Sequence, residues 1–394
     1  MNVYAGIALL LLACVGNAAW WAILVNRIHS FPFQEASLKF VRKLHDAGII
    51  LFPPFIFWMA GCRRPGLLHG AFVADLSGIT QCILLYALCG VVPFTWAVAR
   101  WHMRRQPQQL LEVTSQHFDV LNDCQTDAEK KLVRGDRVPF LARFPMNEVY
   151  RLEVTRKRLR FTGRQSREAG HVRTIKVAHF SDTHFAGCPG KRFFEFATDR
   201  LCELQPDIFV FTGDLIDDEA LFPWASEMFT RLSGVATCYS ILGNHDWRLD
   251  YSRIRQGIVG AGWIDIGQQQ LTARVGDVTL LIAGTEAPWI ERNPEVPTPN
   301  TEDIRILLSH SPDQRNFAVA NQFDLMLCGH NHGGQVVLPG IGPVYSPSKY
   351  GVKYAGGTYR RGQMLIHVSR GLAAKEALRW NACPEITLLE IEIS

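Results

Sequence analysis

The sequence has no pair of cysteines in a C-x-x-C arrangement, although ten cysteines are scattered along its 394 residues. A zinc-thiolate site or a disulfide framework would show regular cysteine spacing, so this pattern indicates neither. Unpaired thiols fit a reducing compartment better than an oxidising one. A strong positive charge is also missing. The formal net charge is only +4, so nucleic acid is not an expected partner.

Charged residues are absent from two long apolar stretches near the N-terminus. Residues 3–25 contain no charge and a single asparagine, Asn17, and residues 79–99 are also uncharged. Both stretches are long enough to cross a membrane, which takes about 20 apolar residues. A secretory signal is less well supported, because no basic residue precedes the first stretch. A pump or channel would need ionisable residues inside its spans, and these stretches hold none.

A third apolar stretch, residues 47–61, is short and contains Pro53 and Pro54. It is interpreted as a short span, with a re-entrant segment or an interfacial helix as alternatives. Three spans would place seven basic residues on one side of the membrane, against Arg63 and Arg64 on the other. The seven are Arg27, Lys39, Arg42, Lys43, Arg100, Arg104 and Arg105. The positive-inside rule then predicts a multi-pass protein of the cytoplasmic membrane with its C-terminal part in the cytoplasm, whereas two spans reverse the bias.

Composition divides the chain into three parts. Residues 1–105 are expected to form a membrane region with two or three transmembrane helices, residues 106–145 a linker or a short helical hairpin, and residues 146–394 a globular domain. Near the start of that domain, residues 149–154 alternate as a strand does, and residues 157–161 are expected to pair back as a hairpin. From residue 174 on, short apolar strands alternate with helical stretches, which is typical of an α/β fold.

Five of these strands end in a Gly or Ser turn that carries Asp, Asn or His. Ligands bind at the carboxyl ends of strands in open α/β sheets, so the five turns are expected to meet at one edge. Oxygen and nitrogen ligands without a thiolate suit Mn, Fe, Zn or Co. The seven candidate ligands are Asp182, His184, Asp214, Asn244, His310, His330 and His332.

Seven ligands are too many for one tetrahedral ion but suit two ions that share a bridging ligand. Two ions roughly 3.5–4 Å apart can clamp the attacking and leaving oxygens of a phosphoryl displacement. They also lower the pKa of a bound water, which supplies hydroxide near neutral pH. The pattern therefore predicts hydrolysis of a phosphoester or pyrophosphate substrate.

These blocks resemble, in order, the signature of the calcineurin-like metallophosphoesterases over residues 174–394. The matching blocks are Asp182-x-His184, Gly213-Asp214, Gly243-Asn244-His245-Asp246, His310 and Gly329-His330-x-His332. The resemblance implies a four-layer α-β-β-α sandwich of two mixed sheets. It assigns one divalent or trivalent ion to Asp182, His184 and His332, and the other to Asn244, His310 and His330. It further implies that Asp214 bridges the ions, that His245 is a proton donor or transition-state contact, and that Asp217 orients His245.

The C-terminal part resembles a membrane-associated bacterial branch of that family. The matching pieces are Gly333-Gly334-Gln335-Val336, Pro347-Ser348, Ser369-Arg370-Gly371 and Pro384-Glu385-Ile386. This branch includes phosphodiesterases and one type of UDP-2,3-diacylglucosamine pyrophosphatase, which implies a lipid-linked substrate such as a UDP-diacyl sugar. The sequence departs from the branch at residues 373–378, where a glycine-rich stretch is usual.

The sequence allows two interpretations of several further features. Arg370 is a candidate for binding a substrate phosphate, with a structural salt bridge as the alternative. Trp289 and its proline-rich loop are candidates for the rim of the pocket. The alternative to an enzyme is a membrane scaffold with an inactive phosphoesterase fold, and the complete set of seven ligands with His245 argues against it.

Overall fold

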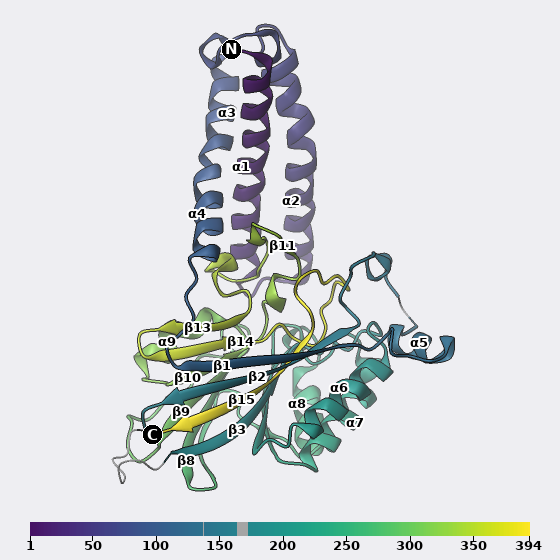
Figure 1. The fold of residues 1–394 in the computed structure, drawn as a ribbon, viewed down its shortest axis with the longest axis vertical. Coiled ribbons are helices and arrows are strands. Elements are labelled where there is room, and N and C mark those ends of the chain that lie inside the picture. The colour runs from purple at the N-terminus through teal and green to yellow at the C-terminus, as the bar shows by residue number, and fades with distance from the viewer. Residues whose placement is uncertain (137, 164–171) are drawn as a thin grey trace. The chain divides into compact units, whose positions relative to one another are not determined.

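The computed structural model describes residues 1–136, 138–163 and 172–394 (Figure 1). Contacts divide the chain into two compact units. The helical unit comprises Met1–Arg104 and Pro339–Lys353, and the sheet unit comprises Arg105–Leu338 and Tyr354–Ser394. The predicted division into residues 1–105, 106–145 and 146–394 stays a prediction, but these groupings show that residues 339–353 pack with the N-terminal helices.

The helical unit is built on α1 (Val3–His29), α2 (Glu35–Ile56), α3 (Gly78–Cys89) and α4 (Val91–His102). Three helical stretches are long and apolar enough to cross a membrane: Val3–His29, Glu35–His69 and Gly78–His102. Residues 47–61 are therefore part of a longer helical stretch, although the sequence suggested a short one. Its two prolines lie inside α2, which runs on into the π-helical turn η1 (Phe57–Cys62).

Helix α1 approaches α3 and α4 closely at two glycines. A Cβ atom on Gly16 would lie 1.9 Å from the carbonyl oxygen of Ala87, and one on Gly90 would lie 2.0 Å from the carbonyl oxygen of Gly16. Small residues allow such close backbone contact, which drives helix association where no water is present to favour apolar burial. Asn17 Nδ2 donates to the Gly48 carbonyl of α2 at 3.0 Å, which adds a polar link between apolar helices.

Residues 339–353 contact the C-terminal ends of α1 and α4. The backbone N–H of Ser346 donates to Asn26 Oδ1 at 2.9 Å, and His102 Nε2 lies 2.9 Å from the Gly340 carbonyl oxygen. The Tyr345 ring packs edge-on against His29, with 6.1 Å between ring centroids. The segment, which contains the short strand β12 (Gly342–Pro343), therefore belongs to one end of the helical unit.

The sheet unit holds two mixed sheets (Figure 1). The first sheet has the order β1-β2-β15-β3-β4-β5-β6 and the second has the order β13-β14-β10-β9-β8-β7. The strands of the first are β1 (Leu110–Asp119), β2 (Arg151–Phe161), β3 (Arg173–Phe180), β4 (Ile208–Thr212), β5 (Thr237–Ile241), β6 (Ile264–Asp265) and β15 (Glu385–Ile393). Those of the second are β7 (Gln270–Val275), β8 (Val278–Thr285), β9 (Ile304–Ser309), β10 (Leu325–Cys328), β13 (Gly357–Arg361) and β14 (Met364–Val368).

Alternating side chains of the strands place the two sheets face to face. In β3, Val177 points into a core shared with the second sheet, whereas Phe180 points into a core shared with helices. Those helices are α6 (Lys191–Glu203), α7 (Phe222–Ser233) and α8 (Tyr251–Gly260). Helix α9 (Arg315–Ala320) connects the parallel neighbours β9 and β10 of the second sheet. The predicted α-β-β-α sandwich of two mixed sheets, preceded by a helical region, is confirmed.

The predicted hairpin over residues 149–161 is wrong. Residues 151–161 form the single strand β2, which pairs antiparallel with β1 and parallel with β15. Alternation identified a strand correctly, but both of its partners lie far away in the sequence. The stretch 106–145, expected to be a linker, contains β1 and helix α5 (Asp127–Arg134), so it supplies the edge of the first sheet.

Candidate metal centre

The turns after β3, β4, β5, β9 and β10 bring their polar side chains together. Within the described residues, three groups of three residues could each hold a metal ion, because the ligand atoms inside each group lie within 4.8 Å of one another. The groups are Asp182–His184–His332, His184–Asp214–His245 and Asp214–His310–His330. Because His184 and Asp214 each belong to two groups, the three form one continuous centre.

Five of these residues have a positive φ angle, although none is a glycine. The values are 54° for Asp182, 38° for His184, 60° for Asp214, 71° for His330 and 49° for His332. Residues other than glycine adopt such angles rarely, at a cost of about 1–3 kcal/mol each. Such strain persists where surrounding contacts hold it and is concentrated at functional sites.

Asp214 lies between the two halves of the centre. Its Oδ2 atom is 3.5 Å from His184 Nε2 and 3.2 Å from His310 Nε2. Its other oxygen, Oδ1, accepts a hydrogen bond from the backbone N–H of His245 at 2.7 Å. A single carboxylate oxygen therefore faces ligand atoms on both sides, which is the arrangement that a bridging ligand requires.

The first half of the centre consists of Asp182, His184 and His332. Asp182 Oδ1 lies 3.9 Å from His184 Nε2 and 3.7 Å from His332 Nε2. His332 Nδ1 lies 3.0 Å from the Ala373 carbonyl oxygen, which can only accept, so Nδ1 carries the proton and Nε2 the lone pair. His184 Nε2 is buried and has no hydrogen-bond partner in the described part of the chain. A buried orphan nitrogen beside two carboxylates fits a metal ligand.

The second half consists of Asn244, His310 and His330. His310 Nδ1 donates to the Thr212 carbonyl at 2.7 Å, which leaves the Nε2 lone pair facing inward. Asn244 Oδ1 lies 3.0 Å and His330 Nδ1 3.1 Å from that Nε2 atom. Three ligand atoms thus converge with Asp214, and this donor set fits a borderline divalent ion.

Trp289 covers the second half. Its ring centroid lies 5.6 Å from that of His310 and 5.0 Å from that of His330. The side chain is buried, with 6% of its surface exposed, so it packs against the ligands. Trp289 thus lies directly beside two candidate ligands, and a place at the rim of the pocket stays a prediction for it and its loop.

Buried charge dominates the electrostatics of the centre. Burial alone would lower the pKa of an imidazole, but the carboxylates outweigh it. Asp217 and then Asp214 raise the pKa of His184 to about 9, and Asp214 raises the pKa of His310 to about 9. The site therefore favours positive charge at neutral pH, which protons supply when no metal ion is bound.

Asp217 contacts two histidines rather than one. Its Oδ1 lies 2.5 Å from His245 Nδ1, as the predicted orienting role requires, and its Oδ2 lies 3.1 Å from His184 Nδ1. Burial alone would raise the pKa of Asp217, but His184 and His245 hold it well below its usual value. The carboxylate thus fixes the proton of each ring on Nδ1 and leaves both Nε2 atoms for other partners.

Comparison with known proteins identifies the family. Residues 175–334 match the calcineurin-like phosphoesterase family. The chain is 30% identical over 231 residues to the uncharacterized metallophosphoesterase YkuE of Bacillus subtilis (strain 168), a match that covers 55% of this chain and 79% of that protein. The chain belongs to the calcineurin-like phosphoesterase family. The predicted enzyme class, a metal-dependent phosphoesterase, is confirmed, and the family uses a dinuclear metal centre.

Two further relatives carry functional names. The phosphoesterase is 27% identical over 222 residues to phosphodiesterase YaeI of Escherichia coli (strain K12), covering 55% of this chain and 82% of that protein. It is 22% identical over 280 residues to UDP-2,3-diacylglucosamine pyrophosphatase LpxG of Chlamydia trachomatis, covering 56% of this chain and 84% of that protein. Both names describe hydrolysis at phosphorus.

Asp246 belongs to a block that the sequence analysis identified, but its role in the site was not predicted. Its fully buried carboxylate accepts hydrogen bonds from the backbone N–H groups of Asp214 (2.9 Å), Leu215 (2.9 Å) and Gly243 (2.8 Å). Burial and the nearby charge of Asp214 raise its pKa to about 6. The residue ties the turn after β4 to the turn after β5, and the only sequence signal was its place directly after His245.

Arg370 has carboxylate partners in the protein. Its Nη2 atom bonds Glu153, and its Nε atom lies 3.3 Å from Glu385 Oε2. This matches the alternative of a structural salt bridge. Contact with a substrate phosphate stays a prediction for Arg370.

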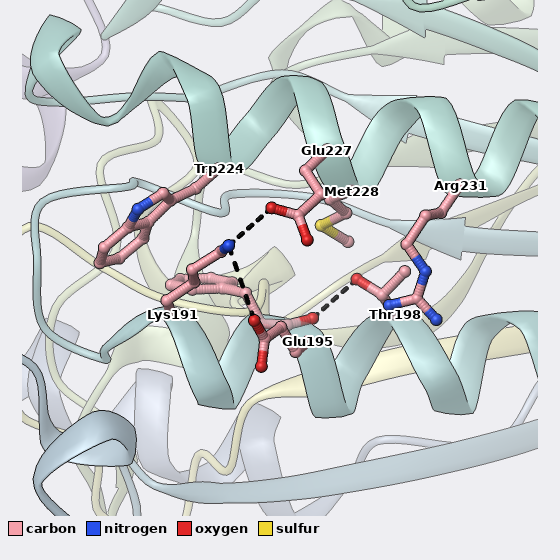
Figure 2. A pocket seen from close by; sticks show the side chains of 8 residues that line it. Lys191, Glu195, Thr198, Trp224, Glu227, Met228 and Arg231 are labelled. Carbon is pink, nitrogen blue, oxygen red and sulfur yellow. Dashed lines mark hydrogen bonds and ion pairs between the residues drawn. The ribbon is translucent and has the colours of Figure 1, made fainter.

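A small pocket lies between α6 and α7, and none of the residues that line it is a candidate metal ligand (Figure 2). Lys191 Nζ lies there 3.7 Å from Glu195 Oε1 and 2.6 Å from Glu227 Oε2. The cavity volume is about 10 Å³, enough for about one water molecule. The pocket is therefore too small to compete with the metal centre as a substrate site.

Proposed function

We propose that this phosphoesterase is a membrane-anchored hydrolase that cleaves a phosphodiester or pyrophosphate bond with two metal ions. One ion is assigned to Asp182, His184 and His332, and the other to Asn244, His310 and His330. The observation that carries the proposal is the position of Asp214 Oδ2, within 3.5 Å of a histidine nitrogen on each side. Mn, Fe, Zn and Co all suit this set of ligands.

The chain's own residues hold the reacting groups in place. When bound, a pair of ions polarises the phosphoryl group and lowers the pKa of water. Asp217 accepts the Nδ1–H of His245, so the ring directs Nε2 at the substrate. The imidazolium form, with a second proton on Nε2, would give that proton to the leaving oxygen and keep the one on Nδ1. The His245 side chain is 15% exposed, whereas those of Asp182 and His184 are 0% exposed, which supports a place for His245 on the open side.

A lipid-linked substrate is supported by two observations. Three helical stretches are long and apolar enough to cross a membrane, and anchoring would concentrate the enzyme where lipid-linked molecules reside. One relative is named for a pyrophosphatase of a diacylated sugar nucleotide. The proposed substrate class is therefore a lipid-linked phosphodiester or pyrophosphate, such as a UDP-diacyl sugar.

A substrate panel tests this function. The full chain, purified in detergent and loaded with Mn²⁺ or Co²⁺, would be assayed on bis-p-nitrophenyl phosphate, a UDP-diacyl sugar and phospholipids. Metal-dependent turnover that favours the UDP-diacyl sugar is expected. Turnover of bis-p-nitrophenyl phosphate alone would contradict the lipid-linked substrate. Lack of any turnover by fully metal-loaded protein would favour the inactive scaffold.

The proposed location is the cytoplasmic membrane, with the metal centre on the cytoplasmic side. Three spans would put seven basic residues on that side and two on the other. Protease added to intact spheroplasts is then expected to leave the sheet unit uncut, and to digest it after lysis. Digestion without lysis would contradict this orientation and favour an external phosphodiesterase.

A further inference from the structure

Arg379 is a fully buried cation whose hydrogen-bond acceptors are mostly backbone carbonyls. Its guanidinium donates to the carbonyl oxygens of His332 at 3.0 Å, Arg370 at 2.6 Å, Ala382 at 3.3 Å and Ala373 at 2.5 Å. In the described part of the chain, no hydrogen bond or ion pair joins it to a carboxylate. Burying a charge in this way is costly, so an arginine here needs a reason beyond filling space.

The Ala373 carbonyl links Arg379 to a candidate metal ligand. It accepts from His332 Nδ1 at 3.0 Å and from Arg379 Nη2 at 2.5 Å, and these two nitrogens lie 3.3 Å from each other. The hydrogen bond to Nδ1 leaves the lone pair of His332 on Nε2, the atom that lies 3.7 Å from Asp182 Oδ1. A partner that fixes the far nitrogen of a ligating histidine sets both its tautomer and its ring orientation.

The segment that supplies this carbonyl also supports Asp182. The backbone N–H of Ala373 donates to the Asp182 carbonyl at 2.8 Å, and that of Leu372 donates to the Ser181 carbonyl at 2.9 Å. A Cβ atom on Gly371 would lie 2.6 Å from the Asp182 Cβ atom, so the backbone passes in direct contact. Arg379 holds this segment through the carbonyls of Arg370 and Ala373, on either side of Gly371 and Leu372.

The second half of the centre has different supports. His310 donates to the Thr212 carbonyl, and the ring of Trp289 covers His310 and His330. The bonds made by the Arg379 guanidinium involve His332 and the segment beside Asp182, on the first half alone.

We propose that Arg379 is a positioning residue for the first half: through the Ala373 carbonyl it orients His332 and so sets the affinity of the ion assigned to Asp182, His184 and His332. This inference rests on the proposed two-ion function. It predicts that changing Arg379 weakens one ion and leaves the other, because the supports of the second half do not include it.

The test uses the full chain with two arginines changed in parallel. Arg379→Met removes all of the carbonyl bonds, and Arg379→Lys keeps the charge but cannot reach four carbonyls at once. Arg305 offers a matched control, since it is also fully buried but bonds Glu302 and the Pro297 carbonyl. Co²⁺ content and visible absorption would be followed during titration with a chelator, and far-UV circular dichroism would report the fold.

We expect Arg379→Met to lose one of two ions at a chelator concentration about 10–100-fold lower than wild type, and Arg379→Lys to show a smaller shift. Arg305→Met should keep both ions. His332→Ala removes a ligand of the first ion and Asn244→Ala a ligand of the second. The Co²⁺ ion that remains in the Arg379 variants should therefore give the spectrum of His332→Ala, not that of Asn244→Ala.

Several results would overturn the inference. Two concern the number of ions: joint loss of both, or loss of neither. A remaining spectrum like that of Asn244→Ala would place the loss in the wrong half. Unfolding of both Arg379 variants, with Arg305→Met still folded, would show a structural role. A wild-type protein that binds fewer than two ions would instead contradict the proposed function.

Discussion

The two halves of the metal centre share Asp214 but are supported by different chemistry. Behind the first half stand charged and strongly polar groups, with Asp217 on His184 and the Ala373 carbonyl on His332. Behind the second half, the Thr212 carbonyl fixes His310 and an indole ring covers both histidines. Because outer contacts tune the basicity and orientation of ligands, the two ions are expected to differ in affinity.

Asp214, the proposed bridging carboxylate, is the residue whose change should affect both halves together. Asp214→Asn is expected to remove nearly all activity and most of both ions, because a neutral amide lacks the charge that holds two cations close. Elemental analysis of the purified variant would measure the ions. Asp199→Asn is the matched control, since Asp199 is an exposed carboxylate on α6 that pairs with Arg231. Two ions per chain with normal turnover in Asp214→Asn would rule out the bridge.

A change at His245 should instead spare both halves. His245→Ala is expected to keep two ions and lose about 10²–10⁴ in rate, the usual contribution of a general acid or base. The loss should be smaller for substrates with good leaving groups, which need less protonation. A series of aryl phosphodiesters would measure this, and an equal loss across the series would argue against proton donation.

Metal affinity should depend on pH through one histidine of each half. His184 and His310 have a pKa of about 9 without metal, so both hold a proton at pH 7 that must leave before an ion binds. Affinity for each ion should therefore rise from pH 7 to pH 9, by up to about 10-fold per pH unit because one proton competes in each half, and level off above. Calorimetry at several pH values would measure it.

The same titration distinguishes the halves. Asp217→Asn removes the carboxylate next to His184 and should reduce the pH dependence of the first half, leaving the His310 part intact. An unchanged slope in this variant would show that His184 is not the group that releases the proton.

The smallest effect is expected at the indole ring over the second half. Trp289→Phe keeps an aromatic ring but loses part of its contact with His310 and His330, so affinity for one ion should fall by less than about 10-fold. Chelator titration with Co²⁺ would measure it, and the ion lost first should be the one missing in Asn244→Ala. Earlier loss of the other ion would contradict the division of the centre into two halves.

Much of this centre could be predicted because its ligands follow strands directly. Short apolar runs ending in Asp182-x-His184 or His330-x-His332 carry their chemistry in adjacent positions. Contacts between residues that are distant in the sequence give no such local pattern. Asp246 and Asp214 lie 32 residues apart, and the Arg379 guanidinium meets His332 across 47 residues.

The fold shows the same limit. Alternation over residues 149–161 predicted strand correctly, but the neighbours of β2 come from residues 110–119 and 385–393, so the local sequence suggested a false hairpin. Apolar composition marked the membrane-like helices, yet Pro53 and Pro54 hid the continuity of α2. Proline is tolerated inside helices packed among other helices, where the freed carbonyls find other partners.

Residues 339–353 limit how this protein can be divided in the laboratory. The segment begins seven residues after His332 and belongs to the helical unit, so a soluble fragment made by removing residues 1–104 would still carry it without the helices that it packs on. Such a fragment would expose new apolar surface a short way along the chain from a metal ligand. Replacing the segment with a short polar linker, rather than trimming the N-terminus alone, is the better route to a soluble enzyme.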